Sequence, residues 1–468
     1  MKNVPPASNF SSFDRLPELL SEGKKRAAES RKPVLVSLTE RINYELNPVI
    51  LFAVATRLHD ECNYWGVPAN HSWLVGVGSE ARIMVDGPDR FDRAKMSLQE
   101  ILRSAIIDKD CQTKPILIGG FRFDHMPQID GNWAGFSDGL LSLPRIMISR
   151  KPPDLFLTLN AFVKSGTNVE PVQAELAASA AALLKEPSPE RWKNASEVVE
   201  ETSREKWRAG VGEALQAIKS GSLRKVTLAR VAKAQSPYPI FPVAVLRSLA
   251  ENYPQCCIFA ICRGDACFVG ASPEELVSLH GRTVSSTCLA GSAPRGISEY
   301  EDSHFSEGLL ESAKEREEHE IVVDWVSDRM QGLCRNLHWN DTPEVFRLGN
   351  VQHLATRFIG TAKDDVSVLD FVNALHPTPA VGGIPLGEAL ELIRRVEAFD
   401  RGWYTGPVGW VDADGFGEFA IALRCALIRG HDAVLYAGTG IVSASDADRE
   451  YEETTLKLKP LLTALGVQ

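Results

Sequence analysis

Four glutamates with helical spacing are the residues of this 468-residue chain whose types point most directly to chemistry. In the stretch KEREEHE, Glu315 and Glu318 are three residues apart and therefore share one face of a helix. Glu450 and Glu453 repeat this spacing in DREYEETTLK. Two such pairs offer the carboxylate oxygens that a hard cation such as Mg²⁺ prefers. The alternative interpretation is two solvated helix faces, held by ion pairs such as Glu453 with Lys457.

A candidate acid–base pair comes from the second half of the chain. Lys225 opens the strand-like segment KVTLAR, whose apolar neighbours can desolvate the amine and favour its neutral, basic form. The alternative is an edge-strand lysine that opposes aggregation. Glu274 lies in the turn VGASPEEL. In an enclosed site this carboxyl can serve as a general acid, whereas on the surface it is an ordinary solvated carboxylate.

Other residues are candidates for binding an anion. Arg424 is the single charge in the apolar segment FAIALRCALI, so it needs an anionic partner, either structural or a ligand carboxylate. His353, in the strand-like VQHLAT, is either structural or a ligand contact. The GTG at 438–440 predicts a tight turn whose N–H groups approach an anion, and it is not a dinucleotide motif because Ser443 takes the third glycine position. The loops LHPTPAVGG and RGWYTGPVGW are either plain turns or site loops.

The elements that must position these residues occur in clusters rather than in strict alternation of strand and helix. In the second half, helices are predicted over 203–219, 304–333 and 446–465, and strands over 225–234, 255–262, 266–271, 275–280, 283–290, 403–412, 417–428 and 432–442. This clustering favours an α+β fold with mixed or antiparallel sheets.

The Pro-rich segment KEPSPERW is the best candidate junction between two halves. It separates an N-terminal part of mixed strands and helices, residues 1–190, from a catalytic region, residues 200–468. We expect the two to form one intertwined structural unit.

The composition excludes several functional classes. The net charge of −10 argues against nucleic-acid binding, which needs basic patches. The nine cysteines contain no Cys-x-x-Cys pair, which predicts reduced thiols rather than a zinc site. The N-terminus lacks the apolar core of a signal peptide, and the longest apolar run, VILFAVA, is too short for a bilayer. We therefore expect a cytoplasmic protein without membrane or nucleic-acid partners, either a monomer or a homodimer.

The order of the motifs is more specific than any one of them. Over residues 205–466 it closely resembles the order found in the chorismate-utilising enzymes. The motifs are KVTLAR, VGASPEEL, LAGSAPRG, SAKEREEHEIVVDWV, VQHLAT, LHPTPAVGG, RGWYTGPVGWVDADGFGEFAIALR and AGTGIVSASDADREYEETTLK. In the first half, GGFRFD, W-x-x-F and LPR resemble the menaquinone-pathway isochorismate synthases. The resemblance implies a large, two-lobed α+β fold of the anthranilate-synthase type, with two β-sheets packed face to face, helices outside and the active site in a cleft.

The resemblance also implies roles for individual residues. The family binds chorismate, a dicarboxylate, through Mg²⁺. Glu318 and Glu453 match its metal ligands, and Glu315 and Glu450 match residues that hold metal-bound waters. Lys225 matches the lysine that activates water to attack ring C2.

The remaining matches concern the acid and the substrate pocket. Glu274 matches the general acid that protonates the departing C4 hydroxyl. The positions that match the substrate-binding pocket are Gly291, Ser292, His353, Tyr404, Arg424, Gly438 and Lys457. By the same resemblance, Arg424 and Lys457 pair with the enolpyruvyl carboxylate or its surroundings.

Three positions discriminate among members of the family. The amine-forming synthases have glutamine at the position of Lys225, and aminodeoxychorismate synthases have a nucleophilic lysine where this chain has Ala290. Ala380 resembles the isochorismate synthases more than the salicylate synthases. The chain departs from the family at Thr405, where alanine is usual, and this leaves the fine positioning of the substrate open.

The predicted function is therefore a Mg²⁺-dependent isochorismate synthase that supplies menaquinone biosynthesis and needs no glutamine amidotransferase subunit. Two alternatives keep the same scaffold: a salicylate synthase, and an isochorismate synthase for siderophore biosynthesis. A non-catalytic chorismate-binding regulator is a third alternative, against which the presence of Lys225, Glu274 and all four helix glutamates argues.

Overall fold

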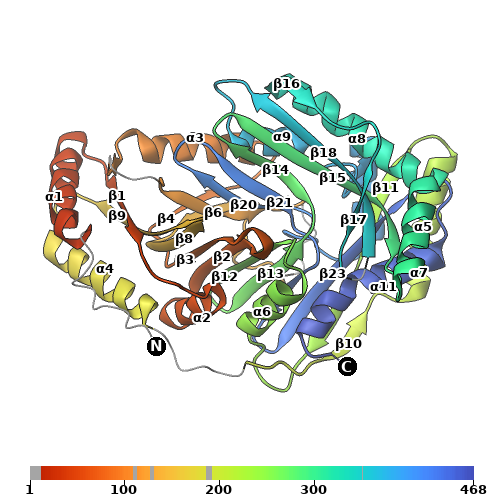
Figure 1. Ribbon diagram of the computed structural model, residues 1–468, viewed down its shortest axis with the longest axis horizontal. Helices are drawn as coiled ribbons and strands as arrows, with labels where there is room; N and C mark the ends of the chain where they lie inside the picture. Colours follow the sequence, from red (N-terminus) through yellow and green to blue (C-terminus); the bar gives the residue numbers. More distant parts are fainter. Residues whose placement is uncertain (1–11, 109–112, 127–130, 186–191, 350, 468) are drawn as a thin grey trace.

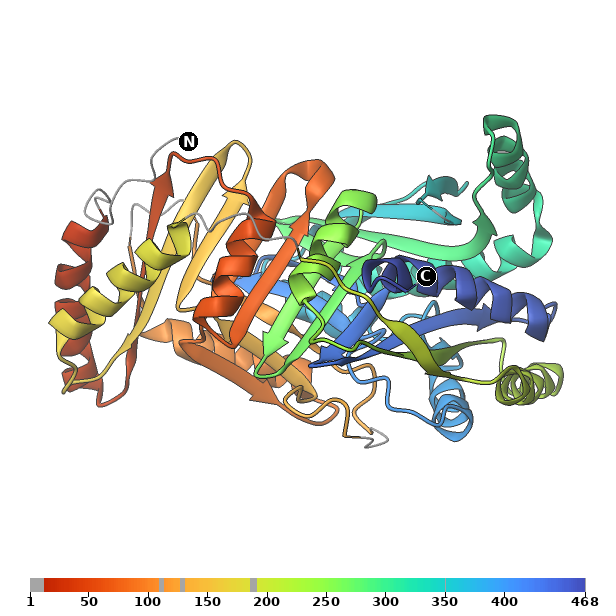
Figure 2. The same ribbon diagram turned by 90° about the horizontal axis from the view of Figure 1, so that it is seen from below.

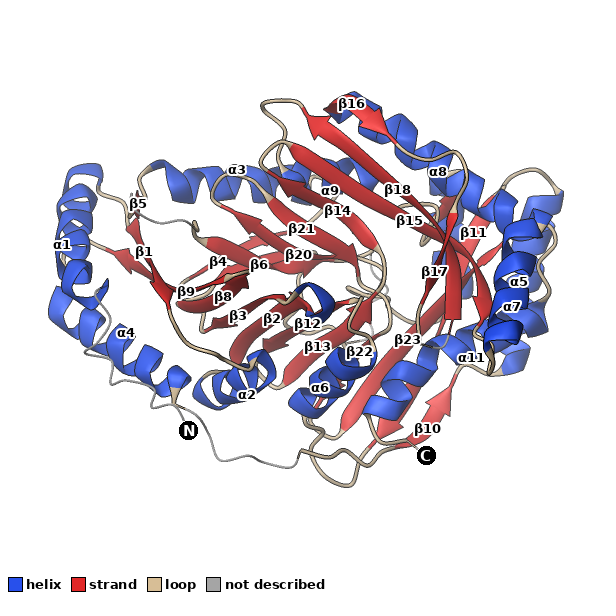
Figure 3. Ribbon diagram, in the orientation of Figure 1, coloured by secondary structure: helices blue, strands red, loops and turns tan. Residues whose placement is uncertain are grey.

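Two β-sheets packed face to face form the centre of the molecule, with helices on the outside (Figures 1 and 3). The computed structural model describes residues 12–108, 113–126, 131–185, 192–349 and 351–467. The predicted α+β fold with two stacked sheets is confirmed. None of the described helices combines the length and the apolar character that crossing a bilayer requires.

The larger sheet has 13 strands among the described residues. In spatial order they are β10 (Glu197–Glu201), β11 (Lys225–Gln235), β23 (Asp432–Ile441), β22 (Cys425–Arg429), β13 (Ala266–Ser272), β12 (Cys257–Arg263), β2 (Glu61–Val67), β3 (Ser72–Val77), β8 (Ile146–Lys151), β9 (Asp154–Val163), β1 (Val34–Ile42) and β5 (Ile106–Ile107), with β19 (Gly383–Ile384) paired to β11.

The smaller sheet has 10 strands in the described part of the chain. Their order is β16 (Cys334–His338), β18 (Val351–Ala362), β15 (Thr283–Pro294), β14 (Glu275–His280), β21 (Gly417–Ile421), β20 (Pro407–Asp412), β6 (Ile116–Phe121), β7 (Gly139–Leu143) and β4 (Ala81–Val85), with β17 (Glu344–Arg347) paired to β18. Apart from β1 with β5, which is parallel, the described strand pairs of both sheets are antiparallel.

The space between the sheets is filled by large apolar side chains from both of them. Phe259 and Phe268 from the larger sheet share one buried cluster with Ile118 and Val408 from the smaller sheet. Alternate residues of a strand point to the same face, so each sheet presents one apolar face to the other.

The helices cover the outer faces (Figures 1 and 2). Against the larger sheet lie α1 (Ser12–Ser30), α2 (Pro48–Leu58), α4 (Val169–Leu184), α6 (Pro242–Asn252) and α11 (Ala447–Ala464), together with the short 3₁₀ turn η2 (Pro68–Asn70). Against the smaller sheet lie α3 (Arg90–Arg103), α8 (Ala313–Leu333) and α9 (Val368–Leu375), with α7 (Glu299–Glu311) beside β15 and β18. The helices α5 (Arg204–Lys219) and α10 (Leu386–Val396) pack on β11.

Two of the predicted helices are confirmed to within a residue or two, because local capping fixes where they begin. Ser203 accepts a hydrogen bond from the Lys206 amide at the start of α5. Asp446 accepts one from the Arg449 amide at the start of α11. Side-chain caps of this kind satisfy amides that have no partner within the helix.

Other predicted elements are wrong. The helix predicted over 304–333 is two helices, because Ser312 has an extended backbone (φ −65°, ψ 114°) that ends α7, while its side chain caps α8. The strand predicted over 417–428 is β21 and β22, which belong to different sheets. The strand predicted to begin at residue 403 begins at Pro407. The predicted turn at 438–440 is the interior of β23.

Candidate active site

The site forms where the chain crosses from one sheet to the other. One crossing runs from β13 in the larger sheet to β14 in the smaller sheet and carries Glu274. The other runs from β21 back to β22 and carries Arg424, whose φ of 46° lies in the left-handed region. The crossings are tied together, since the Ile421 amide donates to the Glu274 carbonyl (3.1 Å) and the Ala271 amide donates to the Arg424 carbonyl (3.1 Å). An acid and a cation from distant segments are thereby brought to one place.

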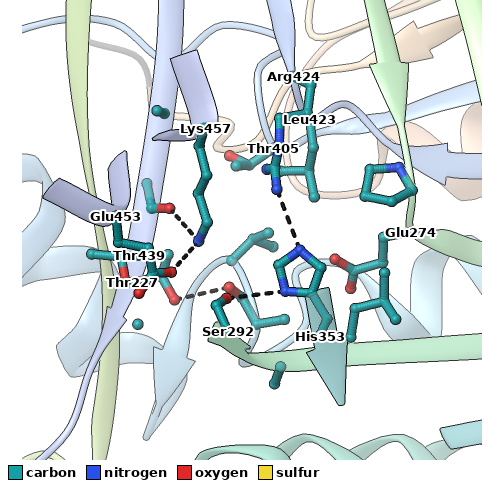
Figure 4. Close-up of a pocket in the computed structure, with 18 of the residues that line it drawn as sticks. Thr227, Glu274, Ser292, His353, Thr405, Leu423, Arg424, Thr439, Glu453 and Lys457 are labelled. Atoms are coloured by element: carbon teal, nitrogen blue, oxygen red, sulfur yellow. Dashed lines mark hydrogen bonds and ion pairs between the residues drawn. The ribbon is translucent and has the colours of Figure 1, made fainter. Parts of the chain in front are cut away.

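A pocket of about 640 Å³, which includes space open to solvent, lies at these crossings (Figure 4). Most of the predicted site residues line it, namely Glu274, Gly291, Ser292, Glu318, His353, Tyr404, Arg424, Gly438, Glu453 and Lys457. The other three do not line it, but each contacts a residue that does. Lys225 pairs with Glu318, Glu315 binds the Ser292 amide, and Glu450 binds Thr439.

Lys225 is completely buried at the start of β11, and its Nζ lies 3.0 Å from Oε1 of Glu318. The edge-strand interpretation of this lysine is therefore wrong. The neighbouring strand β23 makes room for the pair with a glycine, because a Cβ on Gly440 would lie 2.1 Å from Oε1 of Glu318 and 2.9 Å from Cε of Lys225. The glycines of the GTG segment thus serve close approach to buried side chains rather than a turn.

Glu274 is 5% exposed, so the surface interpretation of this residue is wrong. Burial raises the pKa of Glu274 to about 8, although the positive charges of Lys225, Arg424 and Lys457 act in the opposite direction. Removing a carboxylate from water disfavours its charged form, and here this effect exceeds the attraction of the three cations. Glu274 therefore carries a proton near neutral pH, as a general acid must.

His353 is held neutral between Arg424 and the β15 bulge. Burial and the Arg424 charge lower the pKa of His353 to about 3. The Arg424 guanidinium, which can only donate, lies 3.3 Å from Nε2, so Nε2 accepts and Nδ1 carries the hydrogen. Nδ1 lies 3.2 Å from the Gly291 carbonyl and 3.0 Å from the Ser292 hydroxyl. The register of β15 shifts between Ala290 and Ser292, and Gly291 has a φ of 78° there.

Arg424 is 8% exposed, and no described carboxylate forms an ion pair with it. Burial lowers the pKa of its guanidinium. A buried arginine without a counter-ion is costly unless an anion is supplied. Of the two interpretations of this residue, the structure favours a ligand carboxylate.

Acidic side chains from α8 and α11 lie beside the pocket. Glu315 accepts a hydrogen bond from the Ser292 amide (2.9 Å). Burial, together with the nearby charges of Glu318 and Glu453, raises the pKa of Glu315. Burial also acts to raise the pKa of Glu453, but the ion pair with Lys457 (2.5 Å) outweighs it and lowers that pKa to about 2.

Lys314 was not among the predicted site residues, and it bridges the two helices. Its Nζ lies 2.9 Å from Oε1 of Glu450 and 3.3 Å from Oε1 of Glu315. The second oxygen of Glu450 accepts from the Thr439 hydroxyl at 2.7 Å. In the sequence Lys314 is the first residue of KEREEHE, but only the fold, which brings its ammonium to Glu450 of α11, reveals its partner. Glu317, between the two paired glutamates of α8, lies on another face of the helix and is exposed, as helical spacing predicts.

The four glutamates have the oxygen ligands that a hard cation prefers, but their side chains do not converge on one point. They supply only carboxylate oxygens. Three of them form separate ion pairs with lysines: Glu318 with Lys225, Glu453 with Lys457, and Glu450 with Lys314. Among the described residues, no group of three or more His, Cys, Asp or Glu side chains is placed to hold a metal. A cation that binds here must therefore draw carboxylates away from lysines.

Two residues that the motifs did not single out support the site, Tyr436 in the pocket wall and Arg401 behind it. Tyr436 stacks on Tyr404, with ring centroids 5.1 Å apart and an interplanar angle of 16°. The loop before β20 is anchored by a buried ion pair, in which both nitrogens of one Arg401 edge contact Glu397 (2.6 and 2.8 Å). Arg401 was outside the predicted set because only its partners in the fold distinguish it from a surface arginine.

Comparison with known proteins tests the family resemblance that the order of motifs predicts. Residues 22–466 match the family described as chorismate binding enzyme. Isochorismate synthase MenF of Bacillus subtilis is 34% identical over 451 residues, which cover 94% of this chain and 95% of that protein. The salicylate biosynthesis isochorismate synthase of Pseudomonas aeruginosa is 35% identical over 441 residues, covering 93% of this chain and 91% of that protein.

A solved structure shows the same fold. It is MenF, the menaquinone-specific isochorismate synthase from Escherichia coli, with a TM-score of 0.78, 24% sequence identity, and coverage of 95% of this chain and 99% of that chain. The resemblance stated from the motif order is confirmed. By its sequence over nearly its whole length, this chain belongs to the family of chorismate binding enzymes.

Proposed function

We propose that the protein is an isochorismate synthase, which converts chorismate to isochorismate with Mg²⁺ as cofactor. The observation that carries the proposal is the arrangement of one protonated acid, one lysine and one unpaired arginine around a single pocket. Glu274 and Arg424 line the pocket, and Lys225 lies behind its wall against Glu318. Full-length relatives named isochorismate synthase support the assignment.

In the proposed reaction, Arg424 binds a carboxylate of chorismate and orients the ring. Lys225 acts as the general base and takes a proton from water, and the oxygen adds at ring C2. The ring double bonds shift, and Glu274 donates its proton to the C4 oxygen, which leaves as water. One water enters and one leaves, so substrate and product are isomers. A proton taken by Lys225 and one given by Glu274 balance each other.

Glu318 and Glu453 are proposed as the residues that hold Mg²⁺ directly, with Glu315 and Glu450 acting through water. A cation held by these residues would supply positive charge that offsets the substrate carboxylate. His353 stays neutral and keeps the Arg424 guanidinium aimed at the pocket.

The test is the product formed from chorismate by the purified chain, measured by HPLC with Mg²⁺ and with a chelator. We expect isochorismate with Mg²⁺, little turnover with the chelator, and no requirement for ammonia or glutamine. Salicylate as the main product would replace this function with the salicylate synthase alternative. No consumption of chorismate under either condition would contradict the proposal.

We further propose that the product enters menaquinone synthesis. A relative named MenF that matches 94% of the chain supports this placement. Deleting the gene from its host is then expected to remove menaquinone, and added isochorismate or the intact gene should restore it. A deletion strain that keeps its menaquinone and loses a salicylate-derived or catechol siderophore would contradict the placement.

A further inference from the structure

Thr405 has a backbone conformation that its residue type disfavours. Its φ is 61°, in the left-handed region, where a β-branched side chain is a true outlier. Its amide donates to the Ala422 carbonyl at 2.9 Å, so the conformation is fixed by the crossing that carries Arg424. Strain of this kind concentrates where a side chain has a function in the site.

The Thr405 side chain lies in the pocket wall next to the cation that has no ion-pair partner. Thr405 is 1% exposed and lines the pocket together with Leu423 and Arg424 (Figure 4). Lys457 lines the same pocket but is paired with Glu453 (2.5 Å), so among the lining residues Arg424 is the cation left for a carboxylate that binds there.

The hydroxyl is prepared to donate to a ligand. Nη1 of Arg401 donates to Oγ1 of Thr405 at 3.4 Å, and Arg401 is in turn held by Glu397. A hydroxyl that accepts from a cation becomes a stronger donor. Its present acceptor is the carbonyl of the preceding residue, Tyr404, at 2.6 Å, and rotation about one bond of the side chain redirects the proton.

We propose that Thr405 is a specificity-determining residue, whose hydroxyl donates a hydrogen bond to the substrate carboxylate that Arg424 binds. The assignment rests on the proposed function, because chorismate is the dicarboxylate in question. A hydrogen bond to a charged group strengthens binding by about tenfold or more.

Three variants separate the hydroxyl from the shape of the side chain. T405S keeps the hydroxyl, T405V keeps the shape without it, and T405A removes both. For T405V and T405A the KM for chorismate is expected to rise about tenfold or more, with a smaller change in kcat, while T405S stays within about threefold of the wild type. T405A is also expected to unfold at or above the wild-type temperature, because it relieves the β-branched strain.

A second readout keeps this test apart from the proposed function. Chorismate binding is measured as the rise in unfolding temperature that the compound causes, which needs no turnover. If the wild type binds chorismate without converting it and T405V binds it more weakly, the proposed function fails and the role of Thr405 stands. If T405V and T405A match the wild type in KM and in thermal shift, or if T405S is impaired as strongly as T405V, the role of Thr405 is wrong. If the wild type neither binds nor converts chorismate, the proposed function and the role of Thr405 are both wrong. Should T405V fail to fold, T405A compared with T405S gives the same decision.

Discussion

Replacing Glu274 by glutamine tests the acid–base assignment through both activity and stability. Glutamine has nearly the same shape as a protonated glutamic acid but cannot give up a proton. Loss of a general acid typically lowers kcat by about 10²–10⁴-fold. Because Glu274 must be protonated to act, and burial raises its pKa to about 8, wild-type kcat is expected to fall as the pH rises above about 8.

The same substitution has a predicted effect on stability, with a sign that follows from the raised pKa. Between pH 4.5, the ordinary pKa of the group, and about 8, the folded protein keeps a proton on Glu274 that the unfolded chain has released. The free energy of unfolding therefore decreases as the pH rises through this range. At about 1.4 kcal/mol per pH unit, the loss is on the order of 4–5 kcal/mol. Glutamine stays neutral, so the E274Q variant does not suffer this loss.

The assay combines initial rates of isochorismate formation from pH 6 to 9 with urea unfolding at about pH 6 and pH 8.5. The E274Q variant should be nearly inactive. The difference in free energy of unfolding between E274Q and the wild type should favour E274Q more at pH 8.5 than at pH 6. E275Q is the matched control, since the Glu275 side chain accepts a hydrogen bond from Ser285 (2.7 Å) and does not line the pocket. Its kcat should stay within about threefold of the wild type. An active E274Q variant, or one whose stability relative to the wild type is the same at both pH values, would refute the reasoning.

Three further predictions concern the base, the metal and the arginine. K225Q should lower kcat by about 10²-fold or more while leaving chorismate-induced thermal stabilisation largely intact; normal turnover would show that Lys225 is not the base. E318Q should weaken Mg²⁺ binding about tenfold or more in calorimetric titration. The control E317Q, at an exposed position of the same helix, should leave the affinity for Mg²⁺ unchanged. Equal affinity of the two variants for Mg²⁺ would show that Glu318 is not a ligand. R424K should raise the KM for chorismate about tenfold or more, because lysine cannot pair bidentately with a carboxylate; an unchanged KM would contradict the assigned contact.

Local patterns in the sequence were sufficient to predict several of the chemical groups and their elements. The three-residue spacing placed Glu315 beside Glu318 and left Glu317 exposed, because helix periodicity is a local property. Lys225 at the start of a strand and His353 within one were also predictable from alternating apolar neighbours. The order of motifs along the chain indicated the family, which comparison with known proteins confirms.

The tertiary structure decided which of these groups act on one another and in which protonation state. The local sequence around Arg424 predicted an anionic partner and that around Glu274 left its burial open. The two become a buried acid and a cation without an ion pair because the chain crosses between the sheets at both residues. Lys314 meets Glu450, 136 residues later in the chain, only because the fold brings the two side chains together. Burial and charge pairing depend on residues distant in sequence. For that reason the sequence alone could suggest the chemistry of these side chains, while the fold determined their partners, their protons and the strain at Thr405.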